Sequence, residues 1–132
     1  MKQLPDIRAL LRHMNRARDF VRWLREEGDS LVASADLLGG PRWVARSEII
    51  VAAARAGHDL APHRLEIQAL HRLLHLDLVQ DLGSPEARRF GVLHPDDPRA
   101  DVARHCAEAL DRGFRALEAL RLAGLAGVRE AA

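Results

Sequence analysis

The most apolar stretch of the chain, residues 63–82, does not follow the single-stripe pattern of a surface helix. Ten of these twenty residues are apolar, and on a helical wheel they fall into two arcs. The first arc holds Leu65, Ala69, Leu73 and Leu76, and the second holds Ile67, Leu70, Leu74 and Leu78. Because a helix that is apolar on two sides is buried on two sides, we expect this helix at the centre of a bundle or in a homodimer interface.

Proline and glycine divide the chain into segments with helical periodicity. Proline suits the first turn of a helix, and glycine suits the residue after its end. The segments are Pro5–Gly28, Pro41–Gly57, Pro62–Gly83, Pro85–Gly91 and Pro98–Gly124, with a further short helix at Ser30–Leu38. No segment shows the alternation of a half-buried strand. The sequence therefore predicts an all-α protein, a compact bundle of five to six helices with three long ones. We expect one domain over residues 1–132, with a frayed tail at about 125–132.

The first long helix, from about Asp6 to Glu27, has an apolar face and a basic face. The apolar face holds Ile7, Leu10, Leu11, Met14, Ala17, Val21 and Leu24. Arg8, Arg12 and Arg16 share the opposite face, which makes nucleic-acid binding one candidate function. Arg18 falls within the apolar face, so we expect it to pair with a carboxylate or to lie in an interface.

The last long helix, which Asp97 is expected to cap, has the most regular pattern. Its apolar face holds Val102, Cys106, Ala109, Leu110, Phe114, Leu117 and Leu120. Charged residues four apart, such as Arg104 with Glu108 and Asp111 with Arg115, predict a solvated face with ion pairs. Cys106 is expected to pack in the core rather than to act as a nucleophile.

Composition narrows the class of protein. The net charge of +1 creates no overall field that would draw the chain to nucleic acid or to a membrane. Every basic residue except Lys2 is an arginine, which with abundant alanine and leucine suggests a GC-rich bacterial genome. The single cysteine fits a reducing compartment. The N-terminus lacks the apolar region of a signal peptide, and the longest strongly apolar run, Ile49–Ala54, is too short to cross a bilayer. We therefore expect a cytoplasmic protein without a membrane partner.

His71 and His75 are the first candidate metal ligands. Their spacing of four places both imidazoles on one side of the helix at residues 63–82, where they could share a metal ion. Arg64 and Arg72 lie on the same arc with Gln68, and a guanidinium beside the pair repels a cation. The other interpretation is a polar arc that faces solvent or a partner.

His58 and Asp59 are the second pair of candidate metal ligands. They follow an alanine-rich helix in the fragment VAAARAGHDL. This fragment resembles the central His-Asp doublet of the HD phosphohydrolases, an all-α family. The resemblance implies that His13 stands for the first histidine of the family and Asp97 or Asp101 for the last aspartate. It implies a metal-activated water that attacks a phosphate ester. The fragment departs from the family where Ala61 and Pro62 follow the doublet, and Asp59 can instead cap the next helix.

Taken together, these patterns favour a protein that binds another macromolecule over an enzyme. No activated nucleophile, phosphate-binding loop or complete metal-ligand set can be read from the sequence, and we expect no cofactor. We expect a small, non-enzymatic bacterial regulatory or adaptor protein that binds a protein partner through a helical surface. The residues expected on that surface are Trp23, Trp43, Arg64, Gln68, His71, Arg72 and His75. A homodimer is expected, because the doubly apolar helix fits an interface between copies.

Overall fold

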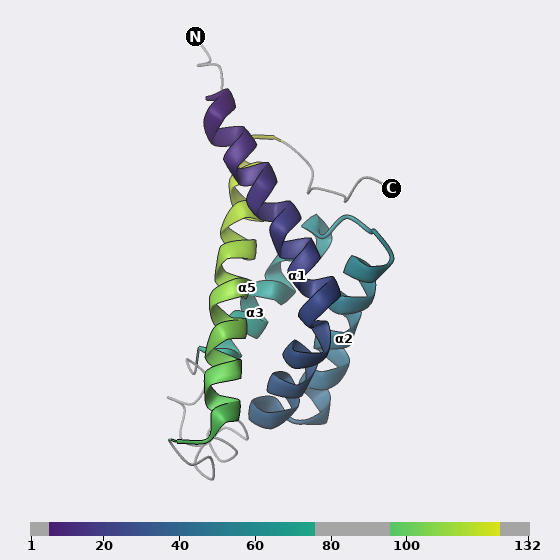
Figure 1. Cartoon of the computed structure of the whole chain (residues 1–132). Coiled ribbons are helices and arrows are strands. Elements are labelled where there is room, and N and C mark those ends of the chain that lie inside the picture. The colour runs from purple at the N-terminus through teal and green to yellow at the C-terminus, as the bar shows by residue number, and fades with distance from the viewer. Residues whose placement is uncertain (1–5, 76–95, 125–132) are drawn as a thin grey trace.

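The computed structural model describes residues 6–75 and 96–124. Their regular secondary structure is entirely helical, which confirms the predicted all-α class (Figure 1). The elements are α1 (Ile7–Gly39), α2 (Pro41–Arg55), a 3₁₀ turn η1 (Ala61–His63), α3 (Arg64–Leu74) and α5 (Pro98–Leu122). In these described residues, no helix is both long and apolar enough to cross a membrane.

Helix α1 is the element along which the other helices pack. It contacts α5, α2 and α3, and its buried positions recur at alternating steps of four and three residues. These positions are Ala17, Val21, Leu24, Gly28, Leu31, Ala35 and Leu38. This heptad-like spacing keeps one face of a long helix toward its neighbours. Arg18 is exposed, so the expectation that it falls within the buried apolar face is wrong. Its position lies just outside the buried stripe.

Helix α1 continues through the predicted break at Gly28, so two of the predicted helices form one. The described residues hold four α-helices, of which α1 has 33 residues and α5 has 25. Gly28 is helical and lies where α2 crosses α1. A Cβ on Gly28 would lie 2.5 Å from Val51 Cγ1, which is closer than packed atoms approach. Glycine therefore allows two helices to come together here, and does not end one of them. The predicted helix at residues 85–90 lies outside the described residues.

The turn between α1 and α2 agrees with its Gly-Gly-Pro sequence. Gly40 has a φ of 79°, a backbone conformation that glycine adopts without steric cost. Pro41 then occupies the first turn of α2, as predicted. Trp43 folds back against Gly39, and the Arg46 guanidinium lies over its ring at 3.9 Å from the ring centroid.

Helix α3 is shorter than the predicted helix at residues 63–82. It ends at Leu74, and residues 76–95 lie outside the described residues. Of the two predicted apolar arcs, the one with Ile67, Leu70 and Leu74 is buried. The other arc is divided, because Leu73 is buried whereas Leu65 is 62% exposed. The helix nevertheless contacts all three other helices, with α5 as its main neighbour.

Helix α5 begins as predicted. The Asp97 carboxylate accepts a hydrogen bond from the Arg99 backbone N–H at 2.9 Å, and Pro98 follows in the first turn. Most of the predicted apolar face is buried, including Cys106 and Leu110, but Val102 is 43% exposed. On the outer face Asp111 pairs with Arg115 at 3.1 Å as expected, whereas Arg104 pairs with Asp101 at 3.0 Å.

Candidate functional site

The structure brings His71 and His75 together at the end of α3. Their ring centroids lie 5.3 Å apart. The Nδ1 atom of His71 lies 2.9 Å from the backbone carbonyl oxygen of Ala107, so in the tautomer that donates this hydrogen bond its Nε2 is an acceptor. His71 is half-buried and His75 is exposed. Within residues 6–75 and 96–124, no group of three His, Cys, Asp or Glu side chains is placed to hold a metal ion.

The residues implied by the resemblance to HD phosphohydrolases lie on different parts of the bundle. His58 and Asp59 follow α2, whereas Asp97 lies at the start of α5 with Asp101 one turn later. The α2–η1 connection and the start of α5 are at opposite ends of the bundle (Figure 1). The Asp59 carboxylate accepts a hydrogen bond from the Ala61 backbone N–H at 3.0 Å. Asp59 therefore shapes the turn before η1, whereas His13 belongs to helix α1.

The two tryptophans expected on an interaction surface lie mostly inside the fold. Trp43 is 4% exposed and belongs to the core. Trp23 is half-buried and stacks on Phe20, with ring centroids 6.1 Å apart. Both rings therefore contribute to packing between helices.

The polar residues expected on the same surface follow α3. Arg64 is half-buried and pairs with Glu118 of α5 at 3.2 Å. Gln68 is half-buried, and Arg72 is exposed. Together with His71 and His75 they lie along α3, whereas Trp23 lies on α1 and Trp43 on α2.

Cys106 is buried on α5, where its thiol lies 3.9 Å from the Ser34 hydroxyl oxygen. Burial raises the pKa of the thiol. A hydrogen bond from Ser34 acts in the opposite direction, and the negative charge of Glu27 acts in the same direction as burial. The group is therefore held as the neutral thiol, which is a poor nucleophile.

We expect Cys106 to react with a water-soluble aromatic disulfide about a hundredfold more slowly in the folded chain than in the chain unfolded by guanidinium. On raising the pH, the rate in the unfolded chain should increase around the ordinary thiol pKa of about 8.5. The increase in the folded chain should begin at a higher pH, because the folded pKa is raised. The release of thiolate measures both rates. Equal rates in both states would contradict the burial of this thiol.

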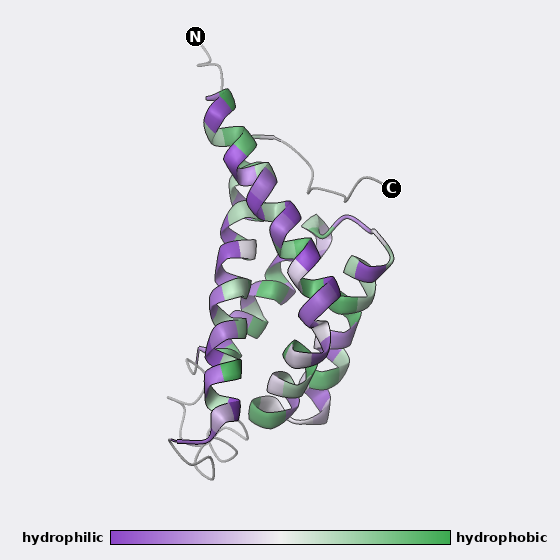
Figure 2. Ribbon diagram, viewed as in Figure 1, coloured by the Kyte–Doolittle hydropathy of each residue, from purple (hydrophilic) through white to green (hydrophobic). Residues whose placement is uncertain are grey.

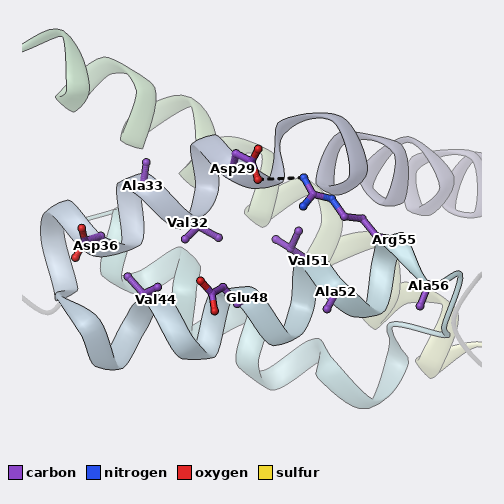
Figure 3. A pocket seen from close by; sticks show the side chains of 10 residues that line it. All are labelled: Asp29, Val32, Ala33, Asp36, Val44, Glu48, Val51, Ala52, Arg55 and Ala56. Carbon is purple, nitrogen blue, oxygen red and sulfur yellow. Dashed lines mark hydrogen bonds and ion pairs between the residues drawn. The ribbon is translucent and has the colours of Figure 1, made fainter.

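A groove between the second half of α1 and α2 is a feature that sequence reasoning missed. It has a volume of about 820 Å³. Its lining residues are Asp29, Val32, Ala33 and Asp36 of α1, with Val44, Glu48, Val51, Ala52, Arg55 and Ala56 from α2 and its end (Figure 3). The close crossing of the two helices at Gly28 lies beside it. The groove depends on the distance between two helices, which no local sequence pattern reveals.

The groove has an apolar floor and an acidic rim. Six of its ten lining residues are valine or alanine, and the other four carry charge. Arg55 pairs with Asp29 at 3.2 Å, as Figure 3 shows. Asp36 and Glu48 lie further along the groove. Three carboxylates against one guanidinium leave the rim with a net negative charge.

The first turns of α1 form a second distinctive surface, which we call the α1 arm (residues 7–16). The first turns of the arm extend beyond the rest of the described bundle (Figure 1). Ile7 is 72% exposed and Leu11 is 52% exposed, and Figure 2 shows hydrophobic positions at this end of α1. The arginines that were expected to share a basic face, Arg8, Arg12 and Arg16, are all exposed on the arm. The sequence predicted both faces of the arm, but not that Ile7 and Leu11 would be left exposed by the described helices.

No known relative assigns a role to the groove, the arm or the histidine pair. Comparison with protein-family models, with curated proteins and with solved structures finds no significant match.

Proposed function

We propose that this protein is a small, non-enzymatic regulatory or adaptor module that binds a helical segment of a protein partner in the α1–α2 groove. The observation that carries the proposal is the groove itself. Its valines and alanines offer apolar surface beside solvent, and its rim is acidic. Grooves of this kind accept amphipathic helices, whose apolar side chains recur every three or four residues. The negative rim selects a helix with basic flanks.

The dimensions of the groove fit a short helix. On the α2 side the lining residues run from Val44 to Ala56, which at 1.5 Å per residue is about 18 Å. A bound helix of about three turns spans this length. Ala52 and Ala56 have small side chains, so the backbone of a bound helix can approach α2 closely.

Nucleic-acid binding is the second candidate, and the exposure of Arg8, Arg12 and Arg16 favours it. Three guanidiniums along one face could contact phosphates. However, Ile7 and Leu11 lie on the same arm and are also exposed. An apolar surface of this kind gains little from a phosphate backbone and much from a protein partner, so we rank the protein partner first.

A designed peptide tests the groove. We expect the chain to bind a labelled helical peptide of about three turns, with leucines on one face and lysines beside them. A matched peptide with glutamates in place of the lysines should bind at least about tenfold more weakly, because the rim is negative. Fluorescence anisotropy measures both affinities.

The variant Glu48→Arg tests where that peptide binds. Glu48 is exposed, so the substitution should leave the fold intact. It changes the rim from three carboxylates against one guanidinium to two against two, so we expect the preference for the basic peptide to be lost. The control is Glu108→Arg, which makes the same change at an exposed position of α5. An unchanged preference in Glu48→Arg, or equal binding of both peptides by the unmodified chain, would contradict the proposed function.

A further inference from the structure

The exposed face of α1 changes sign along its length. From Ile7 to Arg25 it carries six arginines against Asp19, and from residue 26 to Gly39 it carries four carboxylates and no basic residue. All of these charged side chains are exposed: Arg8, Arg12, Arg16, Arg18, Arg22, Arg25, Asp19, Glu26, Glu27, Asp29 and Asp36. Two copies of α1 laid side by side in opposite directions would therefore place the arginines of the arm beside the carboxylates of residues 26–39 at both ends of the contact.

The apolar parts of this helix have the same complementary arrangement. The arm presents Ile7 and Leu11 at one end, and the groove presents Val32 and Ala33 at the other. Positions 7, 11, 18, 22, 25, 29, 33 and 36 are all exposed and follow one another at steps of three, four or seven. Such steps keep residues on one side of a helix. The arm and the groove thus lie on one side of α1, with the exposed Arg18, Arg22 and Arg25 between them.

We propose that the α1 arm of a second copy of this chain occupies the α1–α2 groove. This inference rests on the proposed function of the groove as a site for a basic amphipathic helix, and it names that helix. The arm has the required chemistry, because Ile7 and Leu11 match the apolar floor and Arg8 and Arg12 match the acidic rim. The arm of the same copy cannot reach its own groove. More than ten residues of continuous helix separate Arg16 from Asp29, which is about 20 Å of rigid rod.

Two antiparallel copies of α1 make this contact twice. When the arm of one copy lies in the groove of the other, the two-fold axis places the second arm in the first groove. Such a closed, reciprocal contact yields a dimer and not a filament. The repeated contact also doubles the buried area, which matters because a single three-turn helix buries less than a stable interface requires.

The oligomeric state of the full chain tests the proposal. We expect light scattering and sedimentation to give a dimer whose dissociation constant rises with salt, because charge pairs contribute to it. The variant Ile7→Asp/Leu11→Asp should raise the dissociation constant by about a hundredfold or more. Both side chains are exposed in a single copy, so the fold should be retained. The control is Leu65→Asp, which places the same charge at an exposed leucine of α3 and should leave the dimer unchanged.

Charge exchange tests the reciprocal arrangement directly. We expect Arg8→Glu/Arg12→Glu and Glu48→Arg each to raise the dissociation constant by at least about tenfold, because like charges then meet in both contacts. Mixing the two variants should restore the dimer as a heterodimer. In the mixture one contact joins the wild-type arm to the wild-type groove. The other joins the glutamate-bearing arm to the groove that carries Glu48→Arg, where the new charges at the substituted positions are unlike. Labelling one variant with a fluorophore measures this association.

Each remaining outcome overturns the proposal. The proposal fails if the chain is monomeric at all concentrations, if the arm substitutions leave the dissociation constant of the dimer unchanged, or if the mixed variants do not form a heterodimer. If the chain is a monomer whose arm binds a DNA duplex or anionic vesicles, then the arm serves that ligand instead. Failure of the groove itself is a separate result. A groove that binds the designed basic peptide in a monomeric chain keeps the proposed function and rejects self-association, whereas a groove that binds neither peptide rejects the proposed function.

Discussion

Replacing Leu70 by alanine should lower the free energy of unfolding by about 3 kcal/mol. Leu70 is 0% exposed on α3, where the helix packs against α1, α2 and α5. The substitution removes buried methyl groups and leaves a cavity that a close-packed interior fills only in part. For buried leucines this costs about 2.7–5 kcal/mol. Equilibrium unfolding by urea, followed by circular dichroism, measures the change.

Leu65→Ala is the matched control, because it makes the same substitution on the same helix. Leu65 is 62% exposed, so little apolar surface leaves the core and the expected change is within about 0.5 kcal/mol. The comparison separates burial from helix propensity, since alanine favours the helix equally at both positions. Similar losses at the two positions would show that both apolar arcs of α3 are covered in solution, as they would be in an interface on the Leu65 side.

The second large effect is expected at Gly113, where α5 crosses α1. A Cβ at this position would lie 2.3 Å from Cγ of Phe20. The Phe20 ring is held by stacking on Trp23, so it has little room to move away. We expect Gly113→Ala to destabilise the chain by about 2 kcal/mol, the usual range for overpacking. The sign of the change in the free energy of unfolding is informative. Alanine is the better helix former by about 1 kcal/mol, so it would stabilise the chain if the position were not crowded.

A double-mutant cycle assigns the cost at Gly113 to the ring that it faces. In the background of Phe20→Leu the added methyl group meets a smaller and more flexible side chain. Gly113→Ala should then cost at least about 1 kcal/mol less than in the wild type, a typical coupling energy for residues in contact. Urea unfolding of the four proteins gives this coupling. A stabilising Gly113→Ala, or a coupling near zero, would contradict the close approach of α1 and α5.

The crossings at Gly28 and Gly113 also bear on the proposed function. The first brings α2 against the second half of α1, beside the groove, and the second holds α5 against α1 near Phe20. Both pack a neighbouring helix closely against α1. Because the arm and the groove lie on this one continuous helix, their separation is set by the helical rise, which a reciprocal contact between two copies requires.

The periodicity of apolar residues determined the class of fold and most of the buried faces. The spacing from Ala17 to Leu24 on α1 and from Cys106 to Leu120 on α5 repeats with the period of a helix, so one face follows from the pattern alone. Asp97 before Pro98 determined the start of α5 in the same local way, because a cap depends only on residues within one turn.

Only the tertiary structure decided the structural role of Gly28 and which apolar residues are buried. From the sequence alone, Gly28 could either end a helix or allow another helix to cross close to it. The contact with Val51 of α2 shows that it allows a crossing, and Val51 is far from Gly28 in the sequence. Leu65 and Leu70 belong to equally apolar arcs, but α1, α2 and α5 cover only Leu70 completely. The groove depends on the distance between α1 and α2. The exposure of Ile7 and Leu11 on the arm depends on how far α1 extends past the neighbouring helices. Local periodicity states which side of a helix is apolar, whereas the packing of distant segments decides whether that side is filled.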